Sequence, residues 1–140
     1  MINSFQNYLK LGKVKRKTPD PEEAKALISK AKDRLEYTKG KAVNNKTAKF
    51  VLEDANEAVR EAAQALMSAK GFKPYSHEAT ISFVKEFYSA DFSEEDIYKF
   101  DKFRQLRNDS IYKAIDIGKA DANSSLLFAR IFIDKILKKF

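Results

Sequence analysis

The sequence predicts an all-α protein, an up-and-down bundle of four or five helices, on three observations. Its 140 residues include only 4 Gly and 3 Pro. Apolar residues recur at steps of three and four, and no segment alternates apolar and polar residues over a sustained length. Capping residues stand where the periodic segments begin or end. At this length we expect one domain over residues 1–140, able to fold without disulfides or structural metal.

A basic arm with a short amphipathic helix is expected over residues 1–19. Residues 1–49 carry 13 Lys and Arg against 5 Asp and Glu, whereas residues 50–140 carry 14 against 15. The positive charge is densest in the run Lys13–Lys17. Such a run contacts phosphate, an acidic protein or only water, and the sequence leaves these alternatives open.

Two long helices are expected next. Asp20 is a suitable N-cap and Pro21 a suitable first residue for a helix that ends near Gly40. The following helix, from about Thr47 to Lys70, has an apolar seam rich in alanine, which allows a partner helix to approach closely. We therefore expect this second segment to be the central helix.

Three further helices are expected in the second half of the chain. Gly71 closes the central helix, and Ser76 and Ser93 are suitable N-caps for the next two. The last helix, residues 122–140, is apolar on most sides, which predicts deep burial or a subunit interface. We favour a homodimer.

Polar residues interrupt the apolar stripe of the helix that begins near Ser93. After Ile97 and Phe100, the inward positions hold Arg104, Arg107, Asn108 and Tyr112. At ~100° per residue these four span an arc of roughly 140° centred on the inward stripe. The sequence therefore predicts a polar cluster on the core-facing side.

Half-buried guanidinium groups need carboxylates, a bound anion or solvent as partners. Asp101, three residues before Arg104, is one available carboxylate. The cluster is either a structural ion-pair network, an exposed helix end, or an anion-binding cleft for RNA phosphate or a nucleotide, whose oxygens match the guanidinium fork.

The segment Arg104–Tyr112 resembles the signature segment of HEPN domains (higher eukaryotes and prokaryotes nucleotide-binding). The alanine-rich helix through Ala55, Ala58 and Ala62, followed by the Gly71–His77 turn, is similar to the same family. The similarity covers roughly residues 20–135. It implies a helical bundle that dimerises, with the signature arginines at a cleft on the two-fold axis, in a toxin-antitoxin or defence setting.

In catalytic HEPN members the resemblance implies a metal-independent ribonuclease site made of Arg, an adjacent polar residue and a His. Arg107 and Asn108 match the first two, whereas Tyr112 occupies the His position. A phenol of pKa about 10 is a poor base, although it can act as an acid. Arg107 remains suited to stabilising the phosphorane, with Arg104 and Arg107 binding phosphate.

Three hypotheses follow. The first is a ribonuclease that uses Arg107, Asn108 and Tyr112. The second, which we favour, is a non-catalytic RNA- or nucleotide-binding module, working beside a nucleotidyltransferase as the resemblance suggests. The third is a structural dimer held together by its arginines.

Two other sets of residues have competing interpretations. His77, the sole histidine, is expected to pack or cap its turn; a sharper alternative places it near Arg107 as the missing base. The acidic row Glu53, Glu57 and Glu61 is expected to be a solvated helix face, with pairing of one member to an arginine of the cluster as the alternative.

Several function classes are disfavoured. The sequence has no Cys, no Gly-rich phosphate loop and no paired-His metal spacing, so we expect neither thiol chemistry nor a metal or cofactor. No apolar run approaches the roughly 20 residues of a membrane span, and the N-terminus does not resemble a signal peptide. A cytoplasmic protein is expected, with no DNA or membrane partner.

Overall fold

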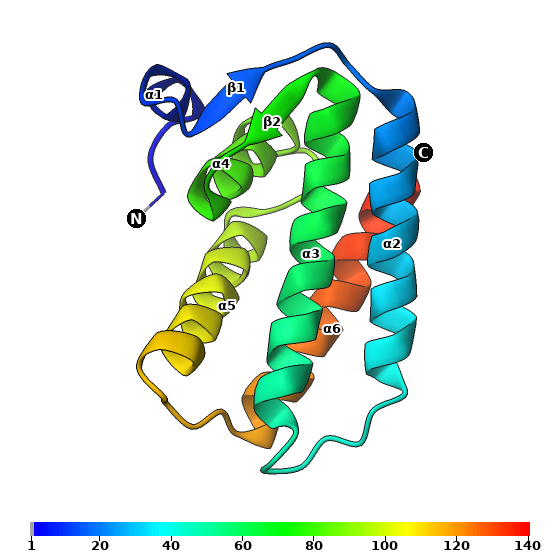
Figure 1. Cartoon of the computed structure of the whole chain (residues 1–140), viewed down its shortest axis with the longest axis vertical. Coiled ribbons are helices and arrows are strands. Elements are labelled where there is room, and N and C mark those ends of the chain that lie inside the picture. The colour runs from blue at the N-terminus through cyan, green and yellow to red at the C-terminus, as the bar shows by residue number, and fades with distance from the viewer. Residues whose placement is uncertain (1) are drawn as a thin grey trace.

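A computed structural model describes residues 2–140, which form six helices and two short strands (Figure 1). The all-α bundle predicted from the sequence is confirmed. In chain order the elements are α1 (Phe5–Lys10), β1 (Val14–Arg16), α2 (Pro21–Lys39), α3 (Ala48–Lys70), β2 (Phe72–Pro74), α4 (His77–Phe87), α5 (Glu94–Tyr112) and α6 (Lys119–Leu137).

The helix boundaries follow the capping residues of the sequence. The side chains of Asp20, Ser76 and Ser93 each accept a hydrogen bond from a backbone N–H of the first turn of α2, α4 and α5. Ser93 also forms a reciprocal capping box with Asp96. Only α6 begins earlier than expected, at Lys119 instead of Ala122.

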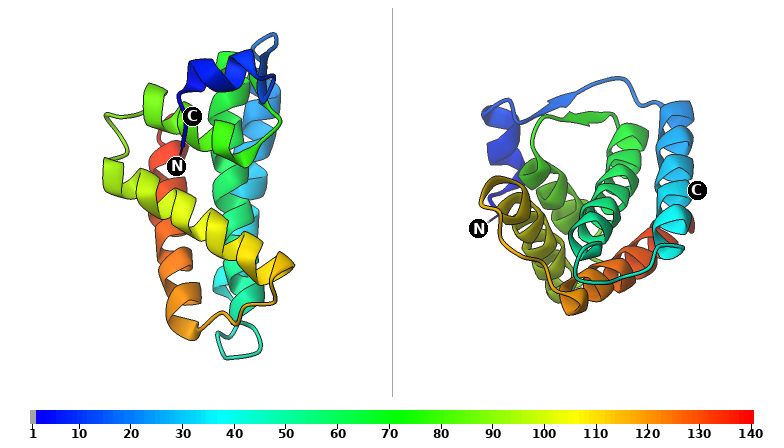
Figure 2. Two further views of the ribbon diagram at one scale, coloured as in Figure 1. Left: turned by 90° about the vertical axis from the view of Figure 1, so that its left-hand side faces the viewer. Right: turned by 60° about the horizontal axis from the view of Figure 1, so that its bottom comes forward.

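The central position predicted for α3 is confirmed (Figure 2). It packs against α2, α4, α5 and α6. Six of the fourteen buried residues of α3 are alanines, among them Ala58, Ala62 and Ala65. These small side chains let neighbouring helices approach α3 closely.

A two-stranded antiparallel sheet, which the sequence did not predict, joins the basic arm to the body of the protein. Val14, Lys15 and Arg16 of β1 face Pro74, Lys73 and Phe72 of β2. Each strand has only three residues, too short to show an alternating pattern. The expected arm is therefore folded, with α1 and β1 packed beside α4 and β2 (Figure 1).

Gly71 makes the turn from α3 into β2 and requires the absence of a side chain. Its φ of +86° ends α3 in the left-handed conformation. A Cβ atom there would lie 2.6 Å from the carbonyl oxygen of Lys17. The N–H of Lys17 donates to the carbonyl of Gly71 at 2.9 Å, so this close approach fixes the start of the sheet.

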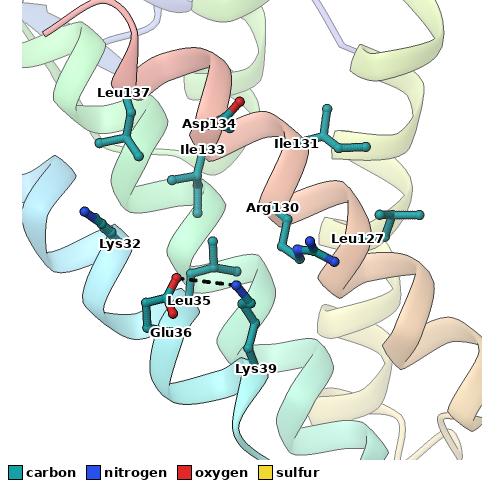
Figure 3. Close-up of a pocket in the computed structure, with 10 residues that line it drawn as sticks. All are labelled: Lys32, Leu35, Glu36, Lys39, Leu127, Arg130, Ile131, Ile133, Asp134 and Leu137. Carbon is teal, nitrogen blue, oxygen red and sulfur yellow. Dashed lines mark hydrogen bonds and ion pairs between the residues drawn. The ribbon is translucent and has the colours of Figure 1, made fainter.

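The outer face of α6 is exposed, contrary to one of the two expectations for this helix. Phe132, Ile133 and Ile136 are buried, but Leu127 and Ile131 are about half exposed. They border a groove of about 490 Å³ between α2 and α6 (Figure 3). All-round burial is therefore wrong for α6, and the alternative of a subunit interface stays a prediction. No helix within residues 2–140 is long and apolar enough to cross a membrane.

Candidate anion-binding site

Arg104, Arg107 and Asn108 lie half-buried on α5, on the side that the sequence predicted. Arg104 is held by Asp101, with Nε and Nη2 of the guanidinium 2.8 and 2.7 Å from Oδ1. Glu78 at the start of α4 lies 3.9 Å away on the other side of Arg104. The expected pairing of Asp101 with Arg104 is thus present, and the charge of Arg104 is largely compensated.

Arg107 differs from Arg104 because it has no carboxylate partner. Its Nη1 donates to Oδ1 of the neighbouring Asn108 at 3.3 Å. Across residues 2–140 it takes part in no ion pair. A half-buried guanidinium with several free donors and no carboxylate in ion-pair contact is suited to an incoming anion.

The fold brings His77 into the electrostatic field of the arginines. Burial, then the positive charges of Arg60, Arg107 and Arg104, lower the pKa of His77 below its ordinary value of 6.5, against the opposing charge of Glu57. His77 is the first residue of α4, where the helix dipole also disfavours a cation. The imidazole is therefore neutral near pH 7. Both interpretations of His77, packing at its turn and a base near Arg107, stay predictions.

Arg60, on α3, belongs to the same region although the sequence analysis did not single it out. Its guanidinium binds the carboxylate of Glu57 and donates to Oε1 of Gln64 at 2.9 Å. Arg60, Gln64, Tyr75 and His77 line a pocket of about 260 Å³. The signal available in the sequence was an arginine directly after Val59, a residue of the apolar seam of α3.

Glu57 links this pocket to the signature arginine. The pKa of Glu57 is lowered, first by its hydrogen bond to Arg60, and further by the charges of Arg34 and Arg107. The carboxylate is therefore ionised and reduces, without cancelling, the positive potential created by Arg60 and Arg107. Of the charges that act on His77, those of the three arginines oppose that of Glu57.

Tyr112 is not half-buried as the other predicted residues of α5 are. It is the last residue of α5, with a side chain 80% exposed. α5 runs diagonally across the bundle, so its final turn projects past the packed region (Figure 2). The inward arc inferred from helical periodicity is correct for Arg104, Arg107 and Asn108 and wrong for Tyr112.

The acidic row of α3 is also not the solvated face that we expected. Glu61 is only 1% exposed, and its carboxylate binds Arg34 at 2.8 Å and Lys30 at 3.4 Å, both from α2. Glu57 pairs with Arg60. Arginines do pair with this row, but they come from α2 and α3 instead of the α5 cluster.

The site is cationic, so its chemistry suits phosphate. In the part of the chain that the structure describes, no group of three or more His, Cys, Asp or Glu side chains converges as metal ligands. Arg60, Arg104 and Arg107 supply hydrogen-bond donors, and His77 supplies one neutral imidazole. These groups bind anions and exchange protons with them.

Comparison with known proteins agrees with the resemblance drawn from the sequence. A family model described as HEPN domain matches residues 24–139. No curated protein matches the chain. The match includes the alanine-rich α3, the turn at Gly71 and the whole of α5, and it supports a nucleotide- or RNA-related function at the level of the family. The chain belongs to the HEPN family.

Proposed function

We propose that this protein binds RNA or a nucleotide through Arg107, assisted by Arg104, Asn108 and His77. The single observation that carries the proposal is that Arg107 is half-buried and forms no ion pair with a carboxylate among residues 2–140. A phosphate oxygen would satisfy the free donors of Arg107 in the bidentate geometry that guanidinium favours. Arg104, held by Asp101, contributes a fixed second cation.

A second candidate is a metal-independent endoribonuclease, which the neutral state of His77 favours. A neutral imidazole near Arg107 is suited to take the proton of a 2′-hydroxyl while that oxygen attacks the adjacent phosphorus. Arg107 would stabilise the phosphorane, and the leaving 5′-oxygen would take a proton from Tyr112 or from water. The products would be a 2′,3′-cyclic phosphate and a free 5′-hydroxyl. In this candidate His77 is the base and Tyr112 keeps the role of a possible acid.

We further propose that the protein works as a homodimer in a toxin-antitoxin or defence setting. Ile111, Tyr112 and Ile115 are exposed at the end of α5, next to the signature residues. A second copy covering this end would bring two Arg107 side chains to one cleft. Sedimentation velocity should then show a species of twice the monomer mass, whereas a monomer at all concentrations would contradict the dimer.

A nucleotidyltransferase remains the partner that we propose. The exposed phenol of Tyr112 is accessible to another protein, and its oxygen is a suitable acceptor for a nucleotidyl group. Incubation with a co-encoded nucleotidyltransferase and a nucleoside triphosphate should then add one nucleotidyl mass to the wild type but not to Tyr112→Phe. An unmodified wild-type protein would contradict this partner.

The experiment that tests the main proposal compares wild type, Arg107→Ala and Arg130→Ala on a mixed RNA pool in EDTA. Arg130 is the matched control because it is an exposed arginine of α6 that also forms no ion pair in the described residues. We expect Arg107→Ala to weaken RNA retention about 10- to 100-fold, the effect of losing charged hydrogen bonds, and Arg130→Ala to change it little.

The readouts also separate the alternatives. Cleavage by the wild type that is lost in both Arg107→Ala and His77→Gln would establish the ribonuclease. Retention of intact RNA that is lost in Arg107→Ala would establish a binding module. No RNA binding by the wild type, together with dissociation of an Arg107→Ala dimer, would support the structural dimer and contradict the proposal.

A further inference from the structure

The two-stranded sheet gathers basic side chains and one tyrosine on a single face. Lys15 of β1 lies directly opposite Lys73 of β2. Lys13 and Tyr75 form the next pair along the ladder, with the N–H of Tyr75 donating to the carbonyl of Lys13 at 2.8 Å. Because side chains alternate between faces of a strand, these four residues share one face. We call this set, Lys13, Lys15, Lys73 and Tyr75, the basic ribbon.

The charges of the basic ribbon are uncompensated. All four side chains are exposed. None of the three lysines forms an ion pair among residues 2–140; the neighbouring Lys17 is instead bound to Glu23 at 3.2 Å. Like charges directly opposite each other on a sheet are destabilising. Placing Lys15 against Lys73 therefore has a cost that a bound polyanion would remove.

Tyr75 lies beside two lysines of the ribbon and is available to a ligand. Its side chain is 54% exposed, and the Nζ atoms of Lys15 and Lys73 lie 5.3 and 5.5 Å from the ring centroid. A tyrosine flanked by cations offers a stacking surface for a nucleobase, with positive charge beside it for the phosphates.

Tyr75 also connects the ribbon to the candidate site. It lines the same pocket as Arg60 and His77, and the charges of Arg60 and Arg107 both act on His77. The ribbon and the pocket thus share Tyr75, and the pocket contains His77, on which the charge of Arg107 acts. The opposite end of the bundle holds the α2–α3 loop (Figure 1).

We propose that the basic ribbon is an extended binding surface for single-stranded RNA whose scissile or anchoring phosphate sits at Arg107. The inference rests on the proposed RNA-binding function. Tyr75 stacks on an unpaired base, and Lys13, Lys15 and Lys73 contact the phosphates on either side of it. Stacking on Tyr75 requires an unstacked base, which single strands present and A-form duplexes do not.

The test measures binding of a labelled single-stranded 2′-O-methyl RNA of roughly 12 nucleotides, within the span of such sites, by fluorescence anisotropy. This probe lacks the 2′-hydroxyl that cleavage needs. We expect Tyr75→Leu to weaken binding about tenfold and Tyr75→Phe, which keeps the aromatic ring, to bind as the wild type does. A duplex of the same sequence should bind equally to wild type and Tyr75→Leu.

The lysines are tested with a matched pair of double variants. Lys15→Gln/Lys73→Gln should weaken binding about tenfold and reduce the slope of log affinity against log salt by about 1.4, since each phosphate contact on a single strand contributes about 0.7. Lys46→Gln/Lys49→Gln removes the same charge from exposed lysines near the α2–α3 loop at the far end. This control should change binding less than twofold.

The outcomes distinguish the ribbon from the proposed function. If the ribbon variants bind like the wild type while Arg107→Ala loses binding, the ribbon inference is overturned and the proposed function stands. If only the ribbon variants lose binding, Arg107 is not the anion site and the ribbon alone is supported. Equal losses in Tyr75→Phe and Tyr75→Leu would overturn stacking, and a wild type that does not bind the probe would overturn both proposals.

Discussion

Two arginines that neighbour α3 have opposite electrostatic surroundings. Arg34, on α2, binds the buried carboxylate of Glu61 at 2.8 Å and lies 3.7 Å from Asp54. Arg107, on α5, has only the amide of Asn108. The hydrogen bond that Arg34 donates to Glu61 raises the pKa of Arg34, as expected of a guanidinium that is held in its charged form. An arginine that is paired with a carboxylate holds two helices together, whereas an arginine without such a partner is free to bind a ligand.

The largest effect that we expect is a loss of stability in a variant that lacks Arg34. Arg34→Ala leaves Glu61 buried with only the long, exposed Lys30 as a partner. We expect the free energy of unfolding to fall by about 2–3 kcal/mol, because an almost unpaired carboxylate stays inside the protein. Urea denaturation followed by circular dichroism measures this loss.

Arg107→Ala is the counterpart in the same experiment. It removes a cation that has no carboxylate partner and that shares its surroundings with Arg60 and Arg104. The free energy of unfolding should change by less than about 0.5 kcal/mol. A loss in Arg107→Ala as large as that in Arg34→Ala would show that Arg107 is structural and would break the comparison.

An intermediate effect is expected when Arg104 of α5 loses its carboxylate partner. Asp101→Asn removes the carboxylate that holds Arg104 and leaves only Glu78, at 3.9 Å, as its partner. The added positive charge should raise the affinity for single-stranded RNA about threefold. Binding assays at two salt concentrations measure the gain, which should shrink at high salt. Unchanged or weaker binding would mean that Arg104 acts only when Asp101 positions it.

The smallest expected effect is a pH dependence that His77 contributes. Its pKa is lowered in the folded protein, so the unfolded chain takes up a proton first as the pH falls below 6.5. The stability that neutral His77 provides is therefore complete above pH 6.5 and is lost as the pH falls toward the lower folded pKa. In His77→Gln, the loss of stability that His77 causes at low pH should be absent. Urea denaturation midpoints measured between pH 7.5 and 5 would show this.

The sequence predicted the helices well because their signals are local. Asp20, Ser76 and Ser93 cap helices by hydrogen bonds within one turn, and Gly71 ends α3 through its own backbone conformation. The two strands were missed because three residues hold too little pattern. Their pairing depends on the return of the chain after Gly71, which no local window contains.

The candidate site was predicted only in part, for a related reason. Arg104, Arg107 and Asn108 share one helix, so periodicity places them together, and Asp101 is one turn away. Tyr112 obeys the same periodicity but lies beyond the region where α5 packs on its neighbours. The proximity of His77 to Arg107, and the burial of Glu61 against Arg34, depend on how different helices meet.

The central claim is that Arg107, beside His77, binds an RNA phosphate. His77 is the sole histidine, so its ring protons can be followed by NMR across a pH titration. In the free wild type we expect its pKa below 6.5, and a rise on saturation with the single-stranded 2′-O-methyl RNA, because a nearby phosphate favours the imidazolium. In Arg107→Ala, the pKa of His77 without RNA should already be higher than in the wild type. Adding RNA should not change it. A His77 pKa that RNA does not move in the wild type, despite binding, would place the phosphate elsewhere and contradict the claim.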